Sequence, residues 1–167
     1  IDPWQQIGDY RDAITFAETL PETDVDRIGI WGSSYSGAHV IVVGALDRRV
    51  KCVSSQVPLI SGHSNARRLI RADFIQGFQK ALEADRRARY KGGAPGMVPV
   101  VAENPLDPSA LPTPDSWTWF TETHKLRAPS WKNEVTLRSV EMFMDYEPGV
   151  YLPFVSPTPL QIVVAVG

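Results

Sequence analysis

The sequence predicts an α/β protein in which helices flank a parallel sheet, and three observations carry this prediction. Helix-like and strand-like segments alternate between residues 3 and 57, an order typical of parallel sheets covered by helices. A segment that is apolar almost all round begins at Ala38, as expected of a helix buried against a sheet. Hydrophobic residues make up 43% of the chain and charged residues 22%, the balance of a globular domain.

The first predicted helix runs from Pro3 to Leu20 and ends before Pro21. Its apolar residues recur at three- and four-residue steps and form one stripe: Trp4, Ile7, Tyr10, Ile14 and Ala17. Four further elements are expected in order: an apolar strand at Arg27–Trp31, a tight turn at Gly32–Gly37, a buried helix at Ala38–Leu46 and a strand at Val50–Val57. Together these elements form the expected core segment, residues 1–60.

The second half predicts a helical insertion over residues 61–157, which acts as a cap or lid, and then a returning core strand in residues 158–167. Its expected elements are one long or two short helices in Ser64–Tyr90, an irregular Pro- and Gly-rich stretch at Gly92–Pro114, an aromatic helix capped by Asp115, a helix at Thr136–Tyr146, extended chain at Pro153–Pro159 and a last strand at Leu160–Val166. The spacing of apolar residues changes from one segment to the next, and glycines and prolines separate the segments. Both observations support this division.

The segment Gly32–Gly37 carries the strongest chemical signal. It fits the nucleophile-elbow pattern G-x-S-x-G, with Ser36 in place of the second glycine. In such a turn the nucleophile sits in strained backbone between a strand and a helix, and small residues two positions away on each side let the two elements approach. The pattern makes Ser34 the candidate nucleophile and the Tyr35 backbone amide a candidate oxyanion donor at a helix N-terminus.

Two alternatives compete with this interpretation. The segment could be a simple Gly/Ser loop between a strand and a helix. Ser33 could instead be the nucleophile, but Trp31 and Tyr35 would then occupy the two positions that need small residues. That arrangement is sterically poor, so the pattern favours Ser34.

The run Asp26–Val40 resembles the elbow of α/β-hydrolases of the dienelactone-hydrolase and acetylxylan-esterase-like kind. It is most similar to the polyketide-transferase-like hydrolases, although Ala38 departs from their usual second glycine. The segments Val57–His63, Thr136–Glu141 and Ser156–Leu160 resemble the same group. The resemblance implies the α/β-hydrolase fold with a cap insertion.

The resemblance also implies that this chain holds only part of that fold. In the family the triad order is serine, acid, histidine. We therefore expect the acid and the histidine beyond Gly167, and the early strands and a second oxyanion donor before Ile1. The chain alone is then expected to have little or no activity. The implied function is a serine hydrolase that acts on an ester or related acyl substrate. The alternatives are an acyltransferase of polyketide-transferase type and a catalytically inactive binding protein.

The remaining candidate residues are three histidines and a group of aromatic side chains. His39 lies five residues past Ser34 on the expected buried helix and is interpreted as a packed, hydrogen-bonded core residue. His63 is a possible pocket residue because it follows the second strand, and His124 is placed in the surface or lid. Trp117 and Trp119 could line an acyl pocket or simply pack the insertion. We expect no metal, because no two histidines have ligand spacing, and no cofactor.

Charge and composition set the expected partners. The formal net charge of −2 argues against nucleic acid, and no apolar run approaches the ~20 residues of a membrane span. The single cysteine, Cys52, permits no internal disulfide, is expected to be buried and is compatible with a cytoplasmic location. The expected partners are a small-molecule acyl substrate and, through an open sheet edge, a second copy of the chain.

Overall fold

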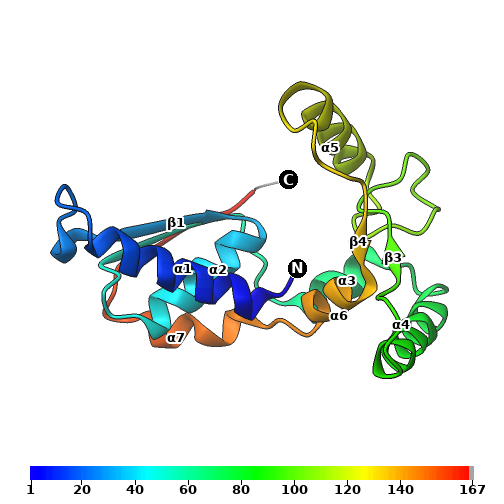
Figure 1. Cartoon of the computed structure of the whole chain (residues 1–167), viewed down its shortest axis with the longest axis horizontal. Coiled ribbons are helices and arrows are strands. Elements are labelled where there is room, and N and C mark those ends of the chain that lie inside the picture. Colours follow the sequence, from blue (N-terminus) through cyan, green and yellow to red (C-terminus); the bar gives the residue numbers. More distant parts are fainter. Residues whose placement is uncertain (166–167) are drawn as a thin grey trace. The chain divides into compact units, whose positions relative to one another are not determined.

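The computed structural model describes residues 1–165 and divides into two compact units (Figure 1). The sheet unit contains Asp2–His63 and the chain from Asp145 onward, and the insertion unit contains Ser64–Met144. Residues 145–157, which the sequence places in the insertion, belong to the sheet unit. The reason is packing, since Val155 forms a buried cluster with Ile41 and Ala45.

The sheet unit is built on three parallel strands in the order β1-β2-β5. These are β1 (Gly29–Ser33), β2 (Cys52–Gln56) and β5 (Leu160–Val163). In register, Trp31 of β1 lies beside Ser54 of β2, which in turn lies beside Gln161 of β5. The predicted parallel sheet is confirmed. β2 and β5 are shorter than the apolar runs that predicted them, whereas β1 keeps the predicted length and begins two positions later, at Gly29. Val166, the predicted end of the last strand, lies outside the described residues.

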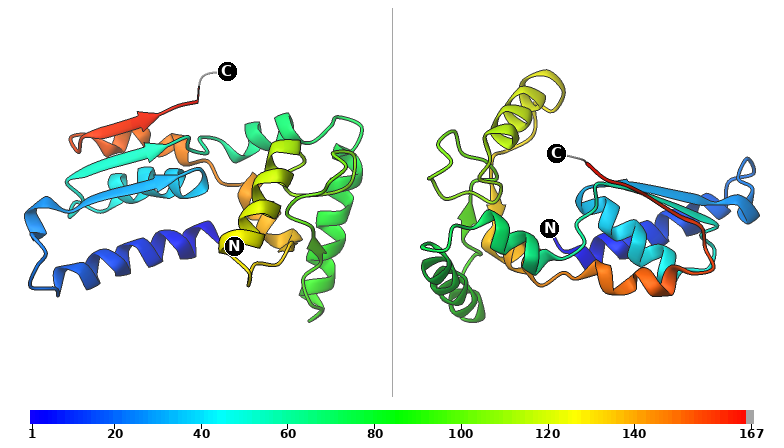
Figure 2. Two further views of the ribbon diagram at one scale, coloured as in Figure 1. Left: turned by 90° about the horizontal axis from the view of Figure 1, so that it is seen from above. Right: turned by 180° about the vertical axis from the view of Figure 1, so that it is seen from behind.

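The helices of the sheet unit lie on one face of the sheet (Figures 1 and 2). They are α1 (Pro3–Glu18), α2 (Tyr35–Leu46) and α7 (Leu152–Val155), with 3₁₀ turns η1 (Val25–Arg27) and η2 (Pro148–Tyr151). Asp2 caps α1 by accepting the amides of Trp4 and Gln5. As predicted, α2 is buried along most of its length. It lies so close to β2 that a Cβ on Gly44 would be 2.5 Å from a Val53 methyl carbon.

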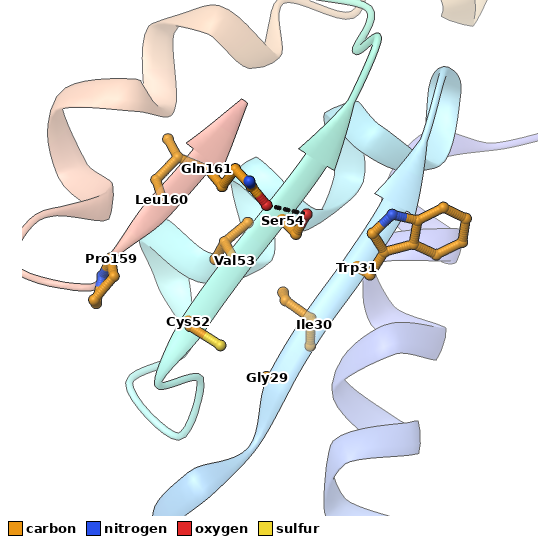
Figure 3. Close-up of a pocket in the computed structure, with 9 residues that line it drawn as sticks. All are labelled: Gly29, Ile30, Trp31, Cys52, Val53, Ser54, Pro159, Leu160 and Gln161. Atoms are coloured by element: carbon orange, nitrogen blue, oxygen red, sulfur yellow. Dashed lines mark hydrogen bonds between the residues drawn. The ribbon is translucent and has the colours of Figure 1, made fainter. Parts of the chain in front are cut away.

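Within the described part of the sheet unit, no helix covers the opposite face of the sheet. A hollow on this face is lined by residues of β1, β2 and the start of β5, and the Ser54 hydroxyl there donates to Gln161 Oε1 at 3.1 Å (Figure 3). Trp31 is 60% exposed, and Cys52 is exposed as well. The prediction of a buried Cys52 is therefore wrong. Alternation along β2 directs Val53 and Ser55 toward α2 and Cys52 to the open side.

Strand β1 is an edge of the described sheet, and we predict that it mediates self-association. No strand of the described residues pairs with its outer edge, although the Trp31 carbonyl accepts from the Tyr10 hydroxyl. This edge and the exposed Trp31 favour addition of a strand from a second copy. Trp31→Lys should shift the monomer–oligomer equilibrium toward monomer in sedimentation velocity. The matched control is Trp119→Lys, because Trp119 is 61% exposed in the insertion unit. A wild-type chain that stays monomeric at every concentration tested would contradict the prediction.

The insertion unit is mainly helical. It contains α3 (Gly62–Leu69, which begins in the sheet unit), α4 (Ile75–Tyr90), α5 (Pro114–Arg127) and α6 (Leu137–Met144), and a short antiparallel pair, β3 (Met97–Val98) and β4 (Val135–Thr136). The buried Asp85 accepts from Arg89 Nε at 2.7 Å and from the Gly96 amide at 2.6 Å, which holds the loop after α4 against that helix. Of the two options for 64–90, the structure shows two helices.

Two local predictions in this half are wrong. Thr113, and not Asp115, caps α5, because the Thr113 hydroxyl accepts the Ser116 amide at 3.3 Å and Pro114 begins the helix. The segment predicted as extended from Pro153 is helical as far as Val155, since a proline in the first turn suits a helix start. Within residues 1–165, no helix combines the length and the apolar character that crossing a membrane requires.

Candidate functional site

Ser34 lies at the junction of β1 and α2, with φ 57° and ψ −116°. This left-handed φ is unfavourable for a residue with a side chain and costs about 1–3 kcal/mol. The surrounding backbone holds it in place. The Ser34 amide donates to the Gln56 carbonyl at 2.9 Å, and the Ser34 carbonyl accepts from the amides of Leu59 at 3.1 Å and Ala38 at 3.2 Å. The predicted sequence of strand, sharp turn and buried helix is confirmed, whereas the loop alternative does not fit this geometry.

Small residues make the turn possible. A Cβ built on Gly32 would lie 2.3 Å from the Ser36 carbonyl oxygen, and one on Gly37 would lie 2.9 Å from the Gln56 carbonyl oxygen. Both distances are well inside van der Waals contact, and both obstacles are backbone atoms. The strand, the turn and the first turn of α2 therefore pack together only because these positions lack side chains.

Ser36 occupies the position where the pattern usually has a glycine, and its hydroxyl has a specific partner. Tyr10 of α1 hydrogen-bonds to Ser36 Oγ at 2.5 Å and donates to the Trp31 carbonyl at 3.2 Å. Tyr10 thus ties α1 to both sides of the turn. The sequence pattern predicts Tyr10 only as part of the apolar stripe of the first helix, so its bond to the turn was missed. The signal that could have indicated a polar partner is Ser36, which stands where the pattern has a glycine.

The Ser34 side chain is exposed, and its hydroxyl makes no capping bond to α2. Tyr35 is the first residue of α2, so its backbone amide lies at the N-terminal end of that helix. The helix dipole favours negative charge at this end of α2. The geometry therefore places an accessible hydroxyl beside a donor suited to an oxyanion. Ser33 lies in β1 and lacks this setting.

Behind the turn, His39 is packed in the core of the sheet unit. It is 2% exposed, its Nε2 lies 3.1 Å from Gln6 Oε1 and its Nδ1 lies 3.1 Å from the Tyr146 hydroxyl. The centroid of its ring also lies 4.6 Å from the centroid of the Tyr35 ring. Burial lowers the pKa of His39 to about 4. The prediction of a packed, hydrogen-bonded histidine is confirmed, because both ring nitrogens are engaged away from Ser34.

The buried His39 predicts a pH dependence of stability. Its pKa is about 4 in the folded chain against 6.5 normally, so the unfolded chain binds more protons between these values. Stability should therefore be full above pH 6.5 and fall by about 3 kcal/mol on acidification to pH 4. Urea denaturation at successive pH values measures this loss. His39→Phe should flatten the curve in that interval, and an unchanged slope in the variant would contradict the assignment.

The other predicted site residues lie in different surroundings. The exposed His63 is the second residue of α3, and its backbone amide donates to Glu147 Oε1 at 2.9 Å. No hydrogen bond among the described residues joins its ring to Ser34. In the insertion unit, Trp119 is 61% exposed and contacts the Phe120 ring edge-on, whereas Trp117 is half-buried on the same helix. The pocket roles of His63, Trp117 and Trp119 stay predictions.

Comparisons with known proteins place these features in a family context. The acetyl xylan esterase family model matches residues 7–86. The thiohydrolase aneE of Aspergillus aculeatus is 30% identical over 98% of this chain and 52% of its own length. The polyketide transferase claH of Penicillium crustosum is 25% identical over 98% of this chain and 54% of its length. The chain thus spans about half the length of the curated relatives it matches.

Two solved structures show the same fold. DcsB, in a complex with its substrate analogue, superposes with a TM-score of 0.78 at 27% identity, over 98% of this chain and 55% of the DcsB chain. The α/β hydrolase GrgF from a Penicillium species superposes with a TM-score of 0.73 at 22% identity, over 98% of this chain and 54% of GrgF. The described sheet and helices are consistent with about half of that fold.

Proposed function

This chain has part of the α/β-hydrolase fold and is related to the acetyl xylan esterases and to the polyketide transferases and thiohydrolases, and from that premise we propose that it is a serine hydrolase. In this proposal Ser34 attacks an ester or related acyl group and forms an acyl-enzyme. The observation that carries the proposal is the strained, exposed Ser34 beside the first amide of α2.

The proposed reaction has two steps. Ser34 Oγ bonds to the acyl carbonyl carbon while its proton passes to a base, and the bond to the leaving group then breaks as that group takes up the proton. Water attacks the acyl-enzyme in the second step and releases the acid. The Tyr35 amide stabilises the oxyanion in both steps. His39 is not assigned as the base, because its ring nitrogens are held by Gln6 and Tyr146.

A second candidate function is acyl transfer, in which an acceptor other than water attacks the acyl-enzyme. The similarity to the polyketide transferase claH supports this candidate. The geometry at Ser34 is the same for both outcomes, because they differ only in the second nucleophile. Adding alcohol acceptors to an ester-cleavage assay separates them: a transferase yields the new ester, whereas a hydrolase yields mainly free acid.

Covalent labelling tests the shared first step. The complete natural polypeptide is treated with a fluorophosphonate, which reacts with activated serines, and the modified peptide is located by mass spectrometry. We expect the modification on Ser34 of the folded protein. Protein that is denatured before the reagent is added should not be modified. Absence of any labelled serine would instead support the binding-protein alternative, and labelling of Ser33 would show that the wrong hydroxyl has been assigned.

A further inference from the structure

The proposed nucleophile lies in a turn whose backbone is held by groups from outside the turn. Ser34 has a left-handed φ of 57°, and such strain persists only where the surroundings over-determine the conformation. The Gln56 carbonyl accepts from the Ser34 amide at 2.9 Å, and the Leu59 amide donates to the Ser34 carbonyl at 3.1 Å. Both bonds act on the Ser34 backbone itself. Other groups must hold the first turn of α2 against β1.

Tyr10 of α1 contacts residues on both sides of Ser34. Its hydroxyl donates to the Trp31 carbonyl at 3.2 Å and lies 2.5 Å from Ser36 Oγ. A phenolic hydroxyl has a single proton, and a carbonyl can only accept. Because the Tyr10 proton goes to Trp31, the bond between Tyr10 and Ser36 has Ser36 as its donor. One hydroxyl thus links β1 to the first turn of α2.

The direction of the Ser36 side chain matters for the turn. A Cβ built on Gly32 would lie 2.9 Å from Ser36 Oγ, so this hydroxyl lies close against the strand. A serine hydroxyl in a helix can otherwise bond to backbone groups nearby and compete with their regular hydrogen bonds. The bond to Tyr10 engages the only proton of the Ser36 hydroxyl and so removes that competition.

Tyr10 can act on the turn without being needed to attach α1 to the sheet unit. Ile7 and Ile14 of the same helix are each 4% exposed and belong to the core. Farther along α1, the Thr15 hydroxyl accepts from Arg49 Nη1 at 2.8 Å. The helix therefore has anchors on both sides of Tyr10, and loss of the Tyr10 hydroxyl should leave it docked.

From these contacts we propose that Tyr10 is a positioning residue for the nucleophile. Its hydroxyl holds β1 and the first turn of α2 at the spacing that keeps Ser34 in its strained conformation beside the Tyr35 amide. Tyr10 does not touch the substrate in this proposal and acts through Ser36 and Trp31. The inference rests on the acyl-enzyme proposed at Ser34 and adds a residue of α1 that raises the reactivity of that serine.

The first measurement compares Tyr10→Phe with Thr15→Val in the complete natural polypeptide. Each replacement removes one hydroxyl from α1 and nearly keeps the size of the side chain, so the two variants should have similar urea midpoints. At saturating fluorophosphonate, folded Tyr10→Phe should be labelled about tenfold more slowly than wild type, the effect of one or two lost hydrogen bonds. Thr15→Val should be labelled at the wild-type rate. The reagent concentration that gives half the maximal rate should be the same for all three proteins, because Tyr10 does not bind the reagent.

The outcomes separate this inference from the proposed function. Equal maximal rates for Tyr10→Phe and wild type would overturn the positioning role and leave Ser34 as the nucleophile. Equal slowing in Thr15→Val would also overturn it, because the effect would then come from the docking of α1. Absence of labelling in the wild type would instead overturn the hydrolase proposal, and the positioning role with it.

The second measurement tests whether Tyr10 acts through Ser36. Ser36→Ala removes the same hydrogen bond from its other end. Because Tyr10→Phe already lacks this bond, the double variant should be labelled as slowly as Tyr10→Phe alone. Rate reductions that multiply in the double variant would show that the two hydroxyls act independently and would overturn the proposed link.

Discussion

Replacing Ser34 with alanine is expected to reduce ester or thioester turnover by the complete natural polypeptide at least about 10³-fold. The physical reason is that the variant keeps the Tyr35 amide but loses the oxygen that, in the proposed mechanism, forms the acyl bond. No other hydroxyl of the turn can replace it. Ser36 is bonded to Tyr10, and Ser33 belongs to β1. Initial rates at saturating substrate measure the effect.

Ser33→Ala is the matched control, because it removes a neighbouring hydroxyl from the same strand end. It should retain wild-type turnover within a few-fold. The two variants should have similar free energies of unfolding, because neither Ser33 nor Ser34 is deeply buried. If Ser34→Ala kept full activity while Ser33→Ala lost it, the elbow register would be shifted by one residue. If both remained active, the chemistry would not occur at this turn.

Local sequence patterns predicted most of the sheet unit because each of its helices and strands is specified by residues within that element or beside it. The glycine at position 32 predicted that two backbone segments pass close to each other there. In the structure, the Ser36 carbonyl occupies the space that a Cβ on Gly32 would need. The apolar run after Ala38 predicted a buried helix, and its central residues, Val40–Val43, are fully buried. Such patterns act over a few residues, so a single sequence contains them completely.

The contacts that surround the turn could not be predicted in the same way. Gln6 and Tyr146 both hold His39, yet Tyr146 is separated from it by 107 positions in the chain. Nothing in the composition of either segment specifies that partner. Likewise, alternation along β2 shows that Cys52 and Val53 face opposite ways, but it does not show which face the helices cover. Distant pairing and face selection depend on the whole fold.

Gly32→Ala is expected to destabilise the sheet unit by about 2–4 kcal/mol and to abolish labelling of Ser34. The added methyl group would lie 2.3 Å from the Ser36 carbonyl oxygen and 2.6 Å from its carbon. Neither backbone atom can move freely, because Tyr10 holds the Ser36 side chain and the Gln56 carbonyl holds the Ser34 amide. The clash must therefore open the strand–helix junction that keeps Ser34 in its strained conformation.

Gly29→Ala separates this effect from a general cost of placing alanine in β1. Its Cβ would also be close to another atom, 2.7 Å from the Cys52 sulfur, but that atom is the end of an exposed side chain that can rotate away. We expect Gly29→Ala to change the urea midpoint little and to leave fluorophosphonate labelling intact. Equal stability and equal labelling in both variants would show that the close approach at Gly32 does not hold the turn. The strain at Ser34 would then have no structural support and the nucleophile assignment no geometric basis.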